Sequence, residues 1–201
     1  MKATDAYGDL LRLGRRIIET REAAVRLGVS VSRASQLLRS LEGSGLVRRL
    51  RHGLWALRPN VEPFSVPPYL TAPLPAYVSF WSALARHGMI EQIPRQIFVA
   101  SLARTQRVAT SLGTYSIHHL EPEVFGGYEG SGERGYLATP EKALFDTVYF
   151  RAPRGRQGLL PELELPDGFR EHVLEEWTSR VARPRLRTIV ARGLAEALAT
   201  A

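Results

Sequence analysis

Apolar residues recur at helical spacing near the start of the chain. One stripe has the i, i+3, i+4, i+7 spacing of a helix over residues 31–42, and it consists of Ala34, Leu37, Leu38 and Leu41. A preceding helix is predicted over residues 21–27, with Thr20 as its N-cap. Glycine tolerates a left-handed backbone and serine caps helices well, so Gly28-Val29-Ser30 predicts a tight turn between the two helices.

The flanking residues extend this pattern on both sides. Residues 4–16 predict a first helix, and Ile17-Ile18 suits a short extended link. Residues 46–50 and 54–57 predict two strands around the basic tip Arg51-His52-Gly53. This order of elements is typical of a winged helix-turn-helix domain, which we expect over residues 1–58.

Prolines dominate the stretch that follows, at Pro59, Pro63, Pro67, Pro68, Pro73 and Pro75. Proline fixes its own backbone and lacks an N–H donor, so this stretch is expected to break regular elements. We predict a Pro-rich linker over residues 59–76, extended on the surface with at most one short strand.

The second half, residues 77–201, mixes helical and strand patterns. Helices are predicted from a Ser79 N-cap to about residue 87, from Thr139 to about residue 150, and over residues 169–181 and 185–199. Strands are predicted over residues 97–101, 114–119 and 136–138, with a loop over 126–135 and a Pro/Gly/Arg-rich stretch after residue 150. The helix after Thr139 is apolar almost all round, which places it in the core. We expect an α+β fold: a winged helix-turn-helix followed by a mixed α+β regulatory domain.

Charge divides the chain at the same boundary. Residues 1–58 carry twelve Lys and Arg against five Asp and Glu, which equals the net charge of +7 of the whole chain. Residues 59–201 carry fifteen of each sign. DNA is a dense line of phosphates whose counterions are released when basic groups neutralise them. A charge excess confined to the predicted DNA-reading module therefore favours binding of double-stranded DNA.

The geometry of two helices joined by a short turn lets the second helix enter the major groove while the first braces it. The free face of that second helix and its cap carry Ser30, Ser32, Arg33, Ser35, Gln36 and Arg39. Arginine can contact guanine or phosphate, glutamine can pair with adenine, and serine is short enough for close phosphate approach. The hairpin adds Arg48, Arg49, Arg51 and His52, expected along the DNA backbone or in a minor groove. Trp55 is expected to pack the hairpin onto the helices.

The chain also resembles a known family, the AbiEi-type antitoxins, also described as transcriptional regulators of viral defence systems. In the first half the resemblance is carried by Thr20-Arg-Glu-Ala-Ala-Val-Arg-Leu-Gly-Val-Ser, Leu41-Glu-Gly-Ser-Gly-Leu-Val and Gly53-Leu-Trp-Ala-Leu. In the second half it is carried by Tyr77-Val-Ser-Phe-Trp-Ser-Ala-Leu-Ala-Arg-His-Gly-Met-Ile-Glu-Gln-Ile-Pro, Leu112-Gly-Thr-Tyr-Ser-Ile-His-His and Leu137-Ala-Thr-Pro-Glu-Lys-Ala-Leu-Phe-Asp. It covers roughly residues 5–150 and not the last fifty.

The resemblance implies three properties. Such antitoxins repress their own operon by binding inverted repeats of operator DNA through the winged helix. Their C-terminal domain counters a toxin that resembles a nucleotidyltransferase, as in type IV toxin–antitoxin and abortive infection systems. Toxin and antitoxin there need not bind each other. Inverted-repeat binding needs two winged helices, in a dimer or in cooperating monomers.

Three further patterns resemble chemical sites. Gly130, Gly132 and Gly135 match G-x-G-x-x-G, but they do not lead from a strand directly into a helix, as a dinucleotide site requires. His118 and His119 are neighbours on a predicted strand and point to opposite faces. We therefore expect no cofactor and no metal ion.

Lys142 and Asp146, four residues apart with Glu141 beside them, fit either a nuclease-like centre or a helix ion pair with an acidic first turn. We favour the ion pair, nominate no catalytic residue, and expect that the protein is not an enzyme. Two rivals to the antitoxin remain: a stand-alone winged-helix regulator without a toxin, and a metal-dependent nucleic-acid enzyme. A module that contacts protein rather than DNA is a third.

Composition adds limits on location. The chain has no cysteine, which excludes disulfides and thiolate chemistry. Its start has no apolar signal region, and no apolar run approaches the length of a membrane span. We expect a cytoplasmic protein without membrane contact.

Overall fold

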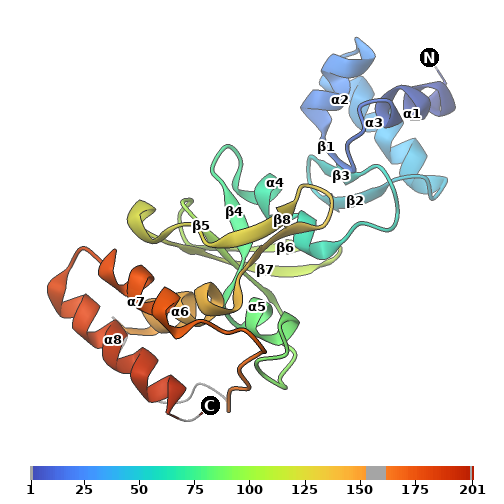
Figure 1. The fold of residues 1–201 in the computed structure, drawn as a ribbon. Coiled ribbons are helices and arrows are strands. Elements are labelled where there is room, and N and C mark those ends of the chain that lie inside the picture. Colours follow the sequence, from blue (N-terminus) through green and yellow to red (C-terminus); the bar gives the residue numbers. More distant parts are fainter. Residues whose placement is uncertain (1, 153–161, 200) are drawn as a thin grey trace.

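The computed structural model of the chain describes residues 2–152, 162–199 and 201. Helices and strands are mixed, and the strands form one three-stranded and one six-stranded sheet (Figure 1). The larger sheet contains both parallel and antiparallel pairs, so the predicted α+β class is confirmed. The Pro/Gly/Arg-rich stretch predicted after residue 150 falls mainly on residues 153–161, outside the described residues.

The N-terminal unit comprises α1 (Ala3–Leu11), β1 (Ile17–Glu19), α2 (Thr20–Leu27), α3 (Val31–Gly43), β2 (Arg48–Arg51) and β3 (Leu54–Ala56). Its strands pair antiparallel in the order β1-β3-β2. The apolar stripe predicted for α3 is confirmed, since Ala34, Leu37, Leu38 and Leu41 are all buried. Gly28 adopts φ 62° at the turn, and the Ser30 hydroxyl accepts a hydrogen bond from the backbone N–H of Arg33.

Two predictions in this unit are wrong. The first helix ends at Leu11 rather than near residue 16, because the chain turns at Gly14 (φ 66°) to enter β1. Thr20 is the first residue of α2 rather than its N-cap. The N-cap is Glu19, whose backbone N–H donates to the Glu22 carboxylate at 3.1 Å. The Thr20 hydroxyl instead accepts from Trp55 Nε1 at 2.9 Å.

The Pro-rich segment is not the extended surface linker that was expected. It contains a 3-10 turn (Pro63–Ser65) and the short helix α4 (Pro67–Thr71), and it leads into β4 (Ala76–Val78). Proline is compatible with the first turn of a helix, where its missing N–H has no intrahelical partner. The side chains of Val66 and Leu70 are buried, so this segment forms part of the core.

The six-stranded sheet has the order β6-β7-β5-β4-β9-β8. Its remaining strands are β5 (Ile97–Ser101), β6 (Gln106–Thr110), β7 (Gly113–His119), β8 (Tyr128–Ser131) and β9 (Gly135–Ala138). Neither β6 nor β8 was predicted, and β8 lies in the expected loop. Both are edge strands, which face water along much of their length and therefore carry few apolar residues.

Helices of the second half are α5 (Phe80–Arg86), α6 (Pro140–Arg151), α7 (Glu171–Ser179) and α8 (Pro184–Leu198). The predicted central helix is confirmed: α6 buries eight consecutive residues, and the Thr139 hydroxyl caps it by accepting from the Lys142 N–H. Ser79 is the N-cap residue of α5, as predicted, but its side chain makes no capping hydrogen bond, because its hydroxyl donates to Asp146. Figure 1 shows α7 and α8 packed with α6 at the end of the molecule opposite the N-terminal unit.

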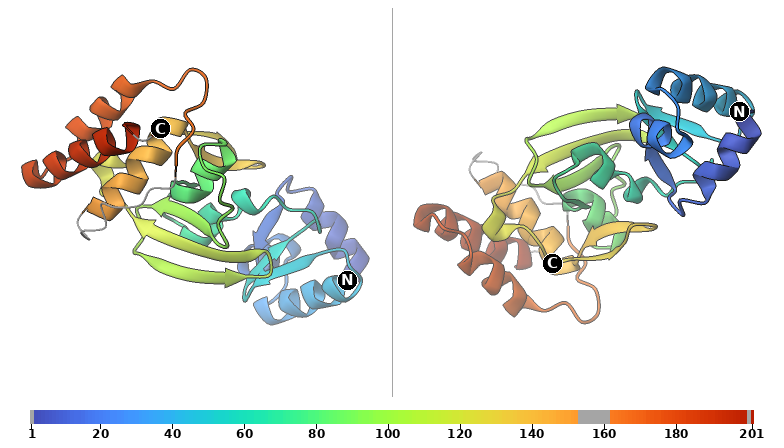
Figure 2. Two further views of the ribbon diagram at one scale, coloured as in Figure 1. Left: turned by 90° about the horizontal axis from the view of Figure 1, so that it is seen from below. Right: turned by 90° about the horizontal axis from the view of Figure 1, so that it is seen from above.

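The small sheet is covered on both faces. One face, with Ile18 and Trp55, packs against the three N-terminal helices. The other face, with Ile17, Leu54 and Ala56, shares a hydrophobic cluster with residues of the second half. Figure 2 shows the β6–β7 hairpin reaching toward the small sheet from that side.

Candidate nucleic-acid interface

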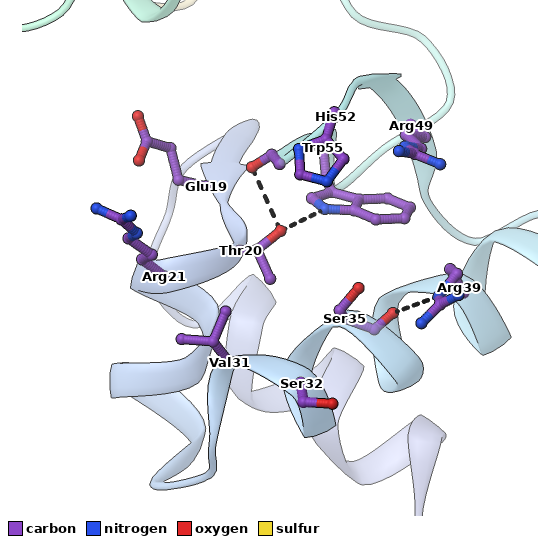
Figure 3. Close-up of a pocket in the computed structure, with 11 residues that line it drawn as sticks. Glu19, Thr20, Arg21, Val31, Ser32, Ser35, Arg39, Arg49, His52 and Trp55 are labelled. Carbon is purple, nitrogen blue, oxygen red and sulfur yellow. Dashed lines mark hydrogen bonds between the residues drawn. The ribbon is translucent and has the colours of Figure 1, made fainter.

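A groove of about 630 Å³ lies between the start of α2, the exposed side of α3 and the β2–β3 hairpin (Figure 3). Its lining includes five of the ten residues predicted to contact DNA: Ser32, Ser35, Arg39, Arg49 and His52. Figure 3 shows Arg39 and Arg49 at one end of the groove and Arg21 at the other. Two successive helices and the hairpin that follows them thus place basic side chains around one opening.

The helical wall is presented by the exposed face of α3. Arg33, Gln36 and Arg39 are exposed, and Ser35 is half-buried. Arg33 Nη1 donates to Gln36 Oε1 at 3.3 Å, one turn along the helix. Arg39 Nε donates to the Ser35 carbonyl oxygen at 3.3 Å. Each of these bonds uses one of the five N–H donors of a guanidinium.

The hairpin wall rests on Trp55. This side chain is 2 % exposed, and its indole N–H donates to Thr20, so Trp55 packs the hairpin onto α2, as predicted. The Arg49 guanidinium lies over the indole, 5.7 Å from its centroid. The backbone N–H of Arg49 donates to the Glu42 carboxylate at 3.1 Å, which links β2 to the end of α3. The hairpin is therefore joined to both helices.

The other predicted residues lie outside the groove lining. Ser30 caps α3, and the exposed side chains of Arg33 and Gln36 lie on α3 beyond the groove. Arg51 is an exposed strand residue, because the two-residue turn consists of His52 and Gly53. Arg48 is separated from the rest: its guanidinium donates to the Ser111 hydroxyl at 3.1 Å and to the Ser111 carbonyl, in the turn between β6 and β7.

Arg21 lines the groove but was not predicted. It lies in the first turn of α2 and is exposed. A cation at the positive end of a helix dipole is unfavourable for the helix, so a basic residue there is a signal that can be read from sequence. Opposite charge is present too, since Glu19 lines the same groove.

A second cluster of charge lies inside the second half. Lys142 and Asp146 both have side chains that are 0 % exposed, and Lys142 Nζ donates to Asp146 Oδ1. Asp146 Oδ2 accepts from Tyr77 Oη at 3.1 Å and from Ser79 Oγ at 2.6 Å. Lys142 Nζ also lies 4.6 Å from the ring centroid of Trp177. The helix ion pair favoured from the sequence is confirmed, although it is buried rather than solvated.

Burial controls the ionisation of this cluster. It lowers the pKa of Lys142 and raises the pKa of Asp146, while the attraction between the two charges opposes both shifts. Burial and the neighbouring carboxylate also raise the pKa of Tyr77. A nuclease-like centre needs carboxylates that reach metal and substrate, whereas Asp146 has all its contacts inside the core. The geometry supports a structural role.

The glycine pattern and the histidine pair lie on strands. Gly130 belongs to β8 and Gly135 to β9, so the glycine pattern spans a hairpin rather than a strand-to-helix turn. His118 and His119 both lie on β7. His118 packs against Phe80 and Phe98, while His119 Nδ1 lies 3.2 Å from the Leu102 carbonyl oxygen. In the described part of the chain, no three His, Asp or Glu side chains are grouped as metal ligands.

No protein-family model matches the sequence, and no curated protein is significantly similar to it. The resemblance to AbiEi-type antitoxins therefore stays a prediction. Among the described residues, no helix combines the length and apolar character needed to cross a bilayer.

Proposed function

We propose that this chain is a DNA-binding transcriptional regulator whose residues 1–58 form a winged helix. The observation that carries the proposal is the groove between α3 and the β2–β3 hairpin, which Arg21, Arg39, Arg49 and His52 line. It belongs to the unit whose net charge equals that of the whole chain. The order of helices and strands, and the β1-β3-β2 pairing, support the winged-helix interpretation.

In this proposal α3 lies in the major groove of operator DNA. Arg33 and Gln36 read base edges, since arginine matches guanine and glutamine matches adenine. Phosphates are neutralised, with release of counterions, by Arg21, Arg39 and Arg49 along the groove of the protein and by Arg51 beside the hairpin turn. The phosphate contacts set affinity and register, and the base contacts set sequence preference.

Binding of DNA by the full chain at several salt concentrations tests this division. Arg33→Ala or Gln36→Ala should cost about 1–3 kcal/mol on the operator and relax base preference. Arg51→Ala should weaken all sequences alike and reduce the salt slope by about one. Fluorescence anisotropy with the region upstream of the chain's own operon provides the measurement. Absence of salt-dependent binding at physiological ionic strength contradicts the proposal, and identical behaviour of the variants contradicts the division.

We further propose that the α+β second half gives the chain an antitoxin role against a nucleotidyltransferase-like toxin, without obligatory binding between them. This rests on the resemblance alone. Two of the segments that carry it, residues 77–94 and 137–146, meet where Tyr77 and Ser79 donate to Asp146. Co-expression with the protein of the neighbouring gene tests the role: relief of its toxicity supports an antitoxin. Unrelieved toxicity, or a neighbour that is not nucleotidyltransferase-like, favours a stand-alone regulator.

A further inference from the structure

We infer that Arg48 is a positioning residue, which fixes the β2–β3 hairpin to the second half of the chain through Ser111, and not a DNA contact. The inference rests on the proposed DNA-binding function. It removes one arginine from the phosphate contacts expected from the sequence and gives the β6–β7 turn a part in DNA binding.

The first support is the hydrogen bonding at the edge of the small sheet. β2 is an edge strand, and its register against β3 passes from Arg49 to Arg51 with a bulge at Leu50. A bulge disturbs the ladder and leaves backbone groups that need other partners. The Leu50 carbonyl finds one in the second half, because the Ser111 N–H donates to it at 2.8 Å.

Arg48 adds two hydrogen bonds to the same residue. Its Nε donates to Ser111 Oγ at 3.1 Å, and its Nη2 donates to the Ser111 carbonyl oxygen. Together with the backbone bond to Leu50, three hydrogen bonds connect one turn residue to β2. Such a fork of donors on one residue restricts both the position and the direction of the strand.

The pairing of the strands explains why neighbouring arginines differ. Arg48 lies opposite Ala56 and Arg49 lies opposite Trp55, and residues opposite each other share a face of the sheet. Ala56 packs in the cluster shared with the second half, whereas Trp55 packs on the N-terminal helices. Arg48 therefore faces the second half, and Arg49 faces the groove.

The β6–β7 turn is itself well fixed. The Thr110 hydroxyl accepts from the Leu112 N–H at 3.1 Å and donates to the Gly113 carbonyl at 3.0 Å. Leu112 packs against the shared hydrophobic cluster. Farther along β7, Tyr115 Oη donates to the Pro63 carbonyl at 2.9 Å. Because the β6–β7 turn is held at these points, it can fix the position of the β2–β3 hairpin.

A hairpin that is already ordered loses less conformational entropy when DNA binds. Arg48→Ala should therefore weaken binding about 3- to 10-fold, and the slope of log K against log salt should stay as in the wild type. Arg49→Ala is the matched comparison from the next position. It should lower the slope by about 0.9, the value for one phosphate contact. Arg107→Ala, in β6 and bonded to Gln96 instead of β2, should change neither.

The experiment uses the full chain and a short DNA duplex of arbitrary sequence, with anisotropy at several salt concentrations. Ser111→Ala removes one acceptor of Arg48 without removing charge, so it should weaken binding less than Arg48→Ala. It should add nothing in the double variant, because both act on one contact. Hydrogen exchange at the Ser111 amide should be several-fold faster in Arg48→Ala.

Each outcome separates the two proposals. A slope lowered by about one in Arg48→Ala shows a phosphate contact and overturns the positioning role. Unchanged affinity in Arg48→Ala, or unchanged amide exchange, also overturns it. Wild-type protein without salt-dependent DNA binding overturns the proposed function itself, whatever the amide exchange shows about the contact between the two halves.

Discussion

Positive charge meets aromatic rings at two places in the chain, with opposite consequences. In the groove, the exposed Arg49 lies over Trp55, and Arg39, which also lines the groove, is exposed too. In the core, Lys142 is fully buried, lies over the rings of Trp177 and Phe145, and is paired with Asp146. The arginines keep their hydration and can exchange it for phosphate. The lysine has already exchanged it for protein groups, so its charge serves the fold.

The sharpest test of this contrast removes one partner of the buried pair. Asp146→Ala leaves the Lys142 ammonium in the core without its carboxylate, and also leaves Tyr77 and Ser79 without an acceptor. Breaking a buried pair in this way costs about 3–5 kcal/mol. Urea unfolding of the full chain should show a loss of this size. Arg39→Ala, from the groove, should change the unfolding free energy by less than about 0.5 kcal/mol.

A double variant keeps the test informative if Asp146→Ala does not fold. Lys142→Met with Asp146→Asn removes both charges and retains an oxygen that can accept from Tyr77 and Ser79. It should lose less stability than either single change, because neither partner is left as an isolated buried charge. A double variant that is less stable than both Lys142→Met and Asp146→Asn would contradict the proposed difference between the buried Lys142 and the exposed arginines of the groove.

Tight packing around Lys142 gives the next largest effect. Gly127 has φ 68°, and a Cβ there would lie 2.6 Å from Trp177 Cζ2 and 3.0 Å from Lys142 Cδ. Gly127→Ala should therefore cost about 1–3 kcal/mol, from backbone strain and overpacking. Gly132→Ala in the adjacent hairpin is the matched control, since nothing lies within 4 Å of its Cβ. Equal unfolding midpoints for the two variants would contradict both the backbone strain at Gly127 and the tight packing against Trp177 and Lys142.

Features that depend on neighbouring residues could be predicted from the sequence, whereas contacts between distant residues could not. The apolar stripe of α3 and the apolar run of α6 are local sequence patterns, and both helices were predicted with nearly correct bounds. Lys142, the near partner of Asp146, could be predicted, but the two hydroxyl partners could not, because Tyr77 and Ser79 lie 69 and 67 residues away. The edge strands β6 and β8 were missed because their exposed residues resemble a loop.

The candidate interface was predicted in composition but not in arrangement. Hairpin arginines were grouped by charge, and strand alternation alone would have placed Arg48 and Arg49 on opposite faces. The sequence does not reveal what covers the second face of the small sheet. That depends on the β6–β7 turn, where Ser111 meets β2. The three-dimensional fold is needed to show that the hairpin arginine Arg48 contacts Ser111, which is distant in sequence.

The smallest change in stability is expected at Glu141, whose environment lies between the exposed groove and the buried core. The Glu141 side chain is buried and lies in the first turn of α6, yet its ion-pair partner Arg170 is exposed. Burial alone would raise the pKa of Glu141, but backbone N–H groups, including that of Arg170 at 3.1 Å, the Thr139 hydroxyl and the Arg170 charge lower the pKa below the usual value of a glutamate. The ionised form therefore stabilises the fold at neutral pH, and this stabilisation is lost as the pH falls through the lowered pKa.

Glu141→Gln should therefore be less stable than the wild type by about 1–2 kcal/mol at pH 7, the scale of hydrogen bonds to a charged group. The difference should shrink as the pH falls through the lowered pKa of Glu141, because protonation removes the same charge from the wild type. Urea unfolding at a series of pH values gives the measurement. A constant difference would mean that Glu141 acts through shape and not through charge. The ionised carboxylate would then contribute as little to folding as the open arginines of the groove are expected to.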